Sequence, residues 1–198
     1  MLALHTVDEF RMFTIMGGSP TVETEEDLAA LGRAFGLSAA RLAEFRSAAP
    51  GAPVAEVYAM LGTDYLFAEY TSRLAEARGR AGAETYLARF AWQSPALGGV
   101  LGACHGTDLP FSWGDLTNGP AAQLVFGGTA PTIADEDLAR RMLASWVAFA
   151  QGKNPGWPRP PSTRTPVMRW DIAEELIEES ASPRRAAWSD VTFEARRR

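Results

Sequence analysis

One histidine and two acidic residues are the side chains best suited to proton transfer in this sequence. His105 lies in the glycine-rich segment LGACHGTDLPF, beside the single cysteine and three residues before Asp108. Glu9 follows a short apolar segment near the N-terminus. A histidine and a carboxylate form the base-and-orienter half of a nucleophilic triad, since the acid holds the proton of one imidazole nitrogen while the other nitrogen accepts the nucleophile's proton. The residue types therefore predict general acid–base chemistry at His105.

The nucleophile that such a pair would activate is absent from this sequence. The serine of an α/β-hydrolase sits in a G-x-S-x-G turn, and the segment GGSPT at Gly17 to Thr21 lacks the second glycine. The sequence also shows no metal-ligand spacing, no phosphate-binding glycine loop and no cofactor fingerprint, so we expect neither a metal nor a cofactor. Cys104 is expected to be a small buried hydrophobic residue, because nothing near it favours a thiolate.

Length and composition predict one globular domain over residues 1–198, with 46% apolar and 22% charged residues. The net charge of −5 argues against a nucleic-acid partner, and the only basic run, Arg196 to Arg198, is expected to be a solvated tail. No segment of about 18 apolar residues occurs, so no membrane span is expected. The N-terminal segment carries too many charges for a signal peptide, and the single cysteine favours a cytoplasmic location.

The periodicity of the apolar residues predicts helices separated by about three strands, which is an α/β pattern. Thr24 and Ser38 are expected to cap helices, and Thr63 a third helix, on which Phe67, Tyr70, Leu74 and Ala77 share one face. A strand over residues 84–92 should bury Tyr86, Ala88, Phe90 and Trp92, since these alternate with polar positions. The remaining expected elements are strands at 2–4 and 165–171, a long helix within 135–151 and a last helix from Ser182. His105 falls in the irregular stretch 93–131 between them.

Several segments resemble the type-B carboxylesterases, the family of the para-nitrobenzyl esterases and cholinesterases. The segment YLARFAWQSPALGGVLGACHGTDLPFSWGDL resembles the histidine-bearing segment of that family, and DEFRMF is similar to the segment that carries its triad acid. The segments TDYLFAEYTSRLAEA and WVAFAQGKNPGWP resemble two of its helices. The resemblance runs from about Val7 to Trp188 in the order of the family.

This resemblance implies the C-terminal part of an α/β-hydrolase fold, mostly helical, without the N-terminal half of the sheet. It implies that Glu9 is the acid and His105 the base of a Ser–Glu–His triad, with Asp108 where the family usually has glutamate. Phe111 and Trp113 follow His105 closely enough to be candidates for lining an acyl pocket. The sequence departs from the family pattern before the acid, where Leu4 and Thr6 replace glycine and asparagine.

Three functional hypotheses follow. The first is a serine-type carboxylic ester hydrolase whose serine lies outside this chain, so that a small ester becomes a substrate only when an N-terminal esterase chain complements it. The second is a catalytically inactive esterase-like module for binding or assembly, in which another chain or a second copy covers the open edge of the partial sheet. The third, an enzyme of another class that uses His105 with Asp108 or Glu9, has the least support from motifs.

Overall fold

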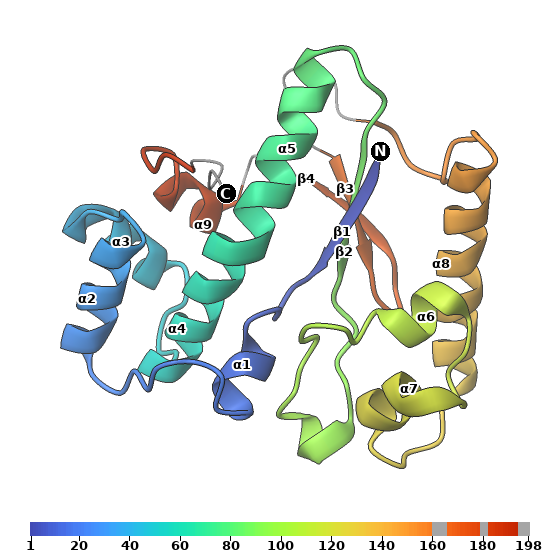
Figure 1. Ribbon diagram of the computed structural model, residues 1–198, viewed down its shortest axis with the longest axis horizontal. Coiled ribbons are helices and arrows are strands. Elements are labelled where there is room, and N and C mark those ends of the chain that lie inside the picture. The colour runs from blue at the N-terminus through green and yellow to red at the C-terminus, as the bar shows by residue number, and fades with distance from the viewer. Residues whose placement is uncertain (160–165, 179–181, 194–198) are drawn as a thin grey trace.

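The computed structural model describes residues 1–159, 166–178 and 182–193, and its centre is a single four-stranded sheet (Figure 1). The strand order is β1-β2-β3-β4, with β1, β2 and β3 parallel and β4 antiparallel to β3. The strands are β1 Leu2–Thr6, β2 Tyr86–Phe90, β3 Pro166–Trp170 and β4 Glu175–Glu178. The basic run at residues 196–198 lies outside the described residues. The mixed sheet and its helices match the expected α/β class.

β4 is the strand that the sequence did not predict. It is four residues long, ELIE, with glutamate at both ends, and charged residues are poor indicators of a strand. The strand forms because it pairs antiparallel with β3, from Pro166 opposite Glu178 to Arg169 opposite Glu175. Short, charged edge strands are a common way to end a sheet without inviting further pairing.

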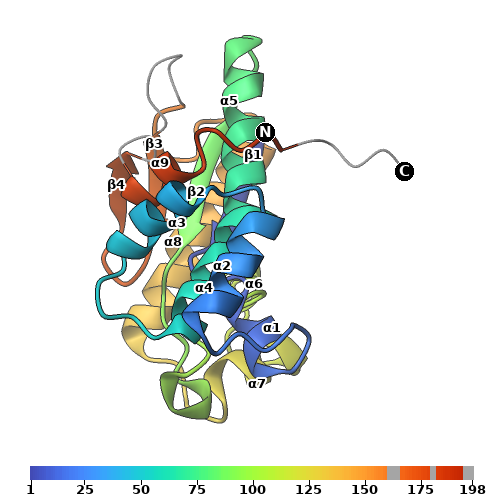
Figure 2. The same ribbon diagram turned by 90° about the vertical axis from the view of Figure 1, so that its left-hand side faces the viewer.

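Helices cover both faces of this sheet. Helix α5 packs on one face, with α2, α3, α4 and α9 beside it, while α6, α7 and α8 lie on the other face (Figures 1 and 2). The helices are α1 Arg11–Ile15, α2 Glu25–Ala34, α3 Ala39–Ser47, α4 Val54–Thr63, the π-helical η1 Asp64–Ala68, α5 Glu69–Arg80, the 3-10 helix η2 Ala96–Gly99, α6 Leu109–Trp113, α7 Gly119–Phe126, α8 Ile133–Ala150 and α9 Pro183–Ala187.

The predicted helix caps at Thr24 and Ser38 are confirmed. Thr24 forms a capping box with Asp27 at the start of α2, and the Ser38 side chain accepts from the Arg41 N–H at the start of α3. The predicted cap at Thr63 is wrong, because the helix already begins at Val54 and continues through Thr63 into η1 and α5. The Thr63 hydroxyl instead accepts a hydrogen bond from the Phe10 N–H at 3.0 Å.

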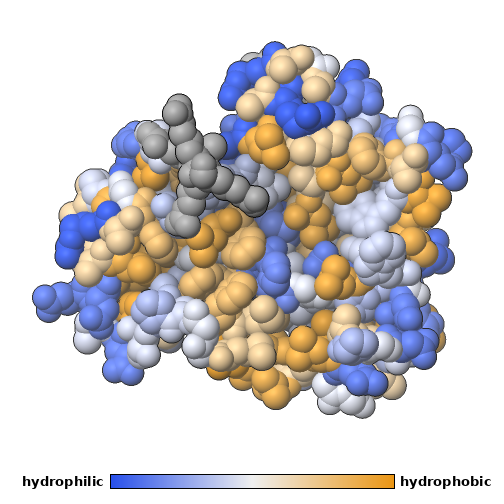
Figure 3. Space-filling view, in the orientation of Figure 1, coloured by the Kyte–Doolittle hydropathy of each residue, from blue (hydrophilic) through white to orange (hydrophobic). Residues whose placement is uncertain are grey.

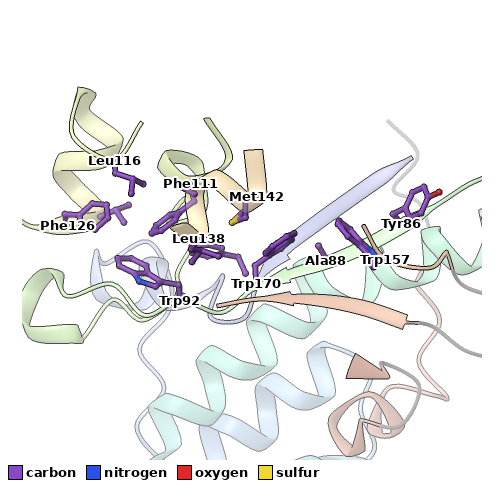
Figure 4. Close-up of a cluster of buried hydrophobic side chains, with 14 residues drawn as sticks. Tyr86, Ala88, Trp92, Phe111, Leu116, Phe126, Leu138, Met142, Trp157 and Trp170 are labelled. Atoms are coloured by element: carbon purple, nitrogen blue, oxygen red, sulfur yellow. The ribbon is translucent and has the colours of Figure 1, made fainter. Parts of the chain in front are cut away.

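The α8 side of the sheet holds an aromatic core (Figure 4). The predicted face of β2 is confirmed, since Tyr86, Ala88, Phe90 and Trp92 are all buried there. Helix α8 contributes Leu138 and Met142, and α6 contributes Phe111, each fully buried. Burial of these aromatic and aliphatic side chains in one continuous cluster stabilises this side of the sheet.

The α5 side is built differently, because Tyr70 and Leu74, two of the residues predicted to share one face, are not among the residues that this helix buries. Tyr70 is 39% exposed and Leu74 is 52% exposed, whereas the buried residues of this helix are Glu69, Ser72 and Ala75. Small and polar side chains allow α5 to lie close to the sheet, where Ala75 contacts the cluster formed with β2 and β3. A predicted apolar stripe of this chain is therefore left on the surface.

No helix among the described residues is both long enough and apolar enough to cross a membrane.

Candidate active site

The turn after β1 positions Glu9. β1 ends at Thr6, and the Val7 N–H donates to the Phe90 carbonyl of β2 at 2.9 Å, so the turn begins on the end of the neighbouring strand. The Thr6 N–H then donates to Glu9 Oε1 at 2.8 Å, which fixes one oxygen of the carboxylate. Helix α4 approaches closely here, since a Cβ at Gly62 would lie 2.4 Å from the ring of Phe10. Glu9 is consequently buried at the carboxyl end of β1.

The segment after β2 presents His105. The chain leaves β2, forms a bridge between Ser94 and Gly102, and then turns at Cys104 to Thr107, where the Thr107 hydroxyl and N–H both donate to the Cys104 carbonyl. This turn places His105 above the carboxyl ends of β1 and β2. Two adjacent parallel strands thus deliver Glu9 and His105 to the same edge of the sheet, the usual location of sites in open α/β sheets.

His105 Nδ1 and Glu9 Oε2 lie 2.6 Å apart. An ionised carboxylate can only accept, so the proton of this hydrogen bond belongs to Nδ1, and the lone pair of Nε2 remains free to accept another proton. The Glu9 side chain is 7% exposed while the His105 side chain is 49% exposed. A buried orienting acid and an accessible imidazole are the arrangement that general base chemistry at Nε2 requires.

Two aromatic rings contact the imidazole of His105. The ring centroids of Phe13 in α1 and Phe67 in η1 lie 5.8 and 5.5 Å from that of His105. These rings pack against the imidazole and give it apolar neighbours. Neither residue was predicted from the sequence, because Phe13 and Phe67 come from separate helices and no local pattern links them to His105.

Asp108 lies near the pair, three residues after His105. Burial and, to a smaller extent, the negative charge of Glu9 raise the pKa of Asp108 to about 6, while the charge of His105 opposes the shift. No side-chain hydrogen bond from Asp108 caps helix α6, which begins at the next residue. Asp108 therefore adds a carboxyl group that changes charge near neutral pH close to Glu9.

Phe111 and Trp113, the two candidates for lining an acyl pocket, lie in different surroundings. Phe111 is fully buried in the aromatic core and packs against Trp92 with ring centroids 4.7 Å apart. Trp113 is 76% exposed at the end of α6. Cys104 is buried as predicted, and burial raises the pKa of its thiol to about 11, so the thiolate that acts as a nucleophile is disfavoured there.

The second histidine, His5, lies in surroundings that do not favour proton transfer. His5 is buried in β1, and its Nδ1 lies 2.9 Å from the Thr6 carbonyl oxygen, to which the neutral ring donates. Burial, together with the charge of Arg89, lowers the pKa of His5 to about 3. Among the described residues, no group of three or more histidine, cysteine or acidic side chains is arranged to hold a metal ion.

Comparison with known proteins relates this chain to esterases. No family model matches the sequence. A secreted lipase of Arthroderma benhamiae is 33% identical over 78 residues, which is 39% of this chain and 13% of the lipase. The fold matches a carboxylesterase of Geobacillus stearothermophilus with a TM-score of 0.79 and 26% identity, over 95% of this chain and 40% of the esterase.

Two further solved structures extend this relationship. A PNB esterase matches with a TM-score of 0.70 and 21% identity, over 94% of this chain and 37% of that one. An esterase of Clostridium hathewayi that can hydrolyze aliphatic aromatic polyesters matches with a TM-score of 0.60 and 18% identity, over 96% and 37%. The chain spans about two fifths of the length of these enzymes. Its fold is that of the C-terminal portion of a type-B carboxylesterase, part of an α/β-hydrolase.

Proposed function

We propose that this chain supplies the acid and the base of a Ser–Glu–His triad in a carboxylic ester hydrolase, and that a separate esterase segment supplies the serine. The observation that carries this proposal is the 2.6 Å contact between Glu9 Oε2 and His105 Nδ1 at the carboxyl ends of two parallel strands. The fold shared with carboxylesterases supports ester hydrolysis over other uses of such a pair.

In the proposed reaction, His105 Nε2 takes the proton of the serine hydroxyl as the serine oxygen bonds to the ester carbonyl carbon. The same proton passes to the alkoxide as the bond between the carbonyl carbon and the leaving alcohol breaks. Water then reacts with the acyl-serine, His105 takes the proton of that water, and the proton returns to the serine oxygen as the acid leaves. Glu9 holds the proton on Nδ1 throughout and stabilises the imidazolium that forms twice in each cycle.

The open edge of β1 is the proposed contact for the nucleophile-bearing segment. Among the described residues β1 pairs with β2 alone, and because alternate residues of a strand direct their backbone N–H groups to opposite sides, the N–H groups of Leu2 and Leu4 point to the unpaired side. Figure 2 shows β4 at the left of the sheet and β1 towards its right. The right-hand side of Figure 2 is the side that faces the viewer in Figure 1. Parallel strands are normally covered on both edges and faces, so this edge is suited to an added strand.

Exposed apolar residues flank that edge. Leu66, Tyr70 and Leu74 form a stripe along η1 and α5 with 42%, 39% and 52% of their surface exposed. Figure 3 shows hydrophobic residues gathered over the middle of the same face. A contiguous group of exposed apolar residues can serve as a contact surface for another protein segment. A strand added parallel to β1 would also bring its carboxyl end towards Glu9 and His105, where the serine is needed.

The experiment measures hydrolysis of para-nitrophenyl acetate by two samples. The first is this chain alone. The second is this chain co-expressed with the part of a carboxylesterase that carries the nucleophile and has no counterpart in this chain. We expect turnover only from the assembled pair. Glu9→Gln should lower its kcat roughly 10³ to 10⁴-fold, because the amide oxygen can stay on the Thr6 N–H and leave the amide NH₂ donor facing Nδ1, which favours the wrong tautomer. Glu84→Gln is the matched control, since it makes the same change at an exposed acid paired with Arg159, and should leave kcat unchanged.

The alternative function is a catalytically inactive esterase-like module for binding or assembly. The exposed stripe on α5 supports this alternative as well as it supports complementation. The two functions differ in one result of the same experiment: a stable complex that forms without any ester turnover would overturn the hydrolase proposal and favour the module.

A further inference from the structure

Asp8 joins the turn that carries Glu9 to the segment that carries His105. Its backbone N–H donates to the Ala103 carbonyl at 3.1 Å, and its side-chain Oδ2 accepts from the Ala103 N–H at 3.0 Å. One residue thus binds both backbone groups of Ala103, which is fully buried and lies two positions before His105. Asp8 itself lies one position before Glu9, so this contact lies within two positions of each member of the pair along the chain.

Other side chains hold the Asp8 carboxylate in this position. The Arg11 guanidinium donates to Asp8 Oδ1 at 3.4 Å and also pairs with Glu56 on α4. The Gln93 side-chain amide donates to Asp8 Oδ2 at 3.5 Å. The Asp8 side chain is only 18% exposed, and these donors compensate its partly buried charge.

The His105 segment carries a glycine where the Asp8 carboxylate approaches it. Gly102 has a φ of +60°, in the region that favours glycine, and a Cβ at this position would lie 2.6 Å from Asp8 Oδ2. A side chain at residue 102 would therefore push the carboxylate away from the Ala103 N–H. The sequence thus provides both the acceptor on one segment and the space for it on the other.

We propose that Asp8 is a positioning residue that sets the separation of Glu9 and His105. This inference rests on the proposed function, because it concerns the geometry of the same pair. Removing the Asp8 acceptor leaves the buried Ala103 N–H without its partner and frees the His105 segment to shift relative to Glu9. A displacement of about 1 Å is sufficient to lower a catalytic rate about 100-fold.

The test is nitrogen-15 NMR of His105 in the full chain, which reports the ring nitrogen that carries the proton in the neutral imidazole. The Glu9 contact holds that proton on Nδ1. We expect Asp8→Ala to move the population towards the Nε2–H tautomer and to speed hydrogen exchange at the Ala103 N–H. Asp8→Asn keeps an oxygen that can accept from Ala103 and should retain more of the Nδ1–H tautomer. In the assembled esterase, Asp8→Ala should lower kcat about 100-fold with KM unchanged.

Two reference variants separate the possible outcomes. Asp27→Ala removes the capping box of α2 and destabilises the chain far from His105, so it should leave the tautomer unchanged. Glu9→Gln should shift the tautomer; if it does not, the proposed pair is wrong and the role of Asp8 falls with it. When Glu9→Gln does shift the tautomer, two other results would overturn only the inference on Asp8. One is that Asp8→Ala matches the wild type. The other is that Asp8→Asn is as damaging as Asp8→Ala.

Discussion

Helices α5 and α8 lie on opposite faces of one sheet, yet they use their apolar residues in opposite ways. Helix α8 buries Leu138 and Met142 in the aromatic core, as its periodicity predicts. Helix α5 buries Glu69, Ser72 and Ala75 and leaves Leu74 half exposed. Both faces of the sheet are covered by this chain, but α5 also carries an exposed apolar stripe that is available for a contact with another segment.

Replacing one leucine on each helix by alanine tests this difference between α8 and α5 most clearly. Leu138→Ala removes a fully buried side chain and should lower the free energy of unfolding by about 2 to 5 kcal/mol, because it leaves a cavity. Leu74→Ala removes a half-exposed side chain on a helix of similar regularity and should change it by no more than about 0.5 kcal/mol. Urea unfolding measures both. Equal losses would show that the stripe on α5 already contributes to the core of this chain.

Buried ionisable groups make the α5 side sensitive to acid. The pKa of His5 falls from 6.5 in the unfolded chain to about 3 in the fold, because burial disfavours the charged ring. The stabilisation is complete above pH 6.5 and is lost as the pH falls towards 3, since the unfolded chain then binds a proton that the fold rejects. Between pH 7 and pH 4 the loss is about 3 kcal/mol. We expect His5→Gln to flatten urea midpoints across this range, and an unchanged slope would contradict this account.

Asp108, beside α6 on the other side of the sheet, should give the opposite pH dependence. Burial raises the pKa of Asp108 from 3.8 to about 6, so the fold favours the neutral acid. Its stabilising effect is present below pH 3.8 and is lost as the pH rises through 6. Asp108→Asn should therefore stabilise the chain by about 1 to 2 kcal/mol at pH 8, after allowance for partial exposure, and by less at pH 4. Thermal unfolding at the two pH values checks the sign.

The sequence predicted local features well because their causes are local. Thr24 and Ser38 cap helices through residues three positions away, and the alternation in β2 reflects which side chains face the aromatic core. The glycine-rich bend at His105 likewise results from residues that are neighbours in the sequence. The pairing of His105 with Glu9, 96 positions apart, was predicted only from the resemblance to a family, since no periodic pattern relates positions so distant.

The features that sequence reasoning missed depend on tertiary contacts. Phe67 reaches the His105 ring from η1, which joins α4 to α5 in one continuous helix where a separate helix start was expected at Thr63, and Phe13 reaches it from α1. The exposed face of α5 was missed for a related reason. Its apolar residues recur with a regular helical period. This period indicates that the face contacts other apolar groups, but it does not indicate that those groups belong to this chain.

Hydrogen exchange of this chain, with and without a nucleophile-bearing esterase segment, tests directly whether that segment binds along the open edge of β1. We expect the amides of Leu2 and Leu4 on this edge, together with those of residues 66–74, to become protected when the segment binds, while the amides of α8 do not change. Binding that protects α8 and leaves β1 and residues 66–74 exchanging as before would contradict it.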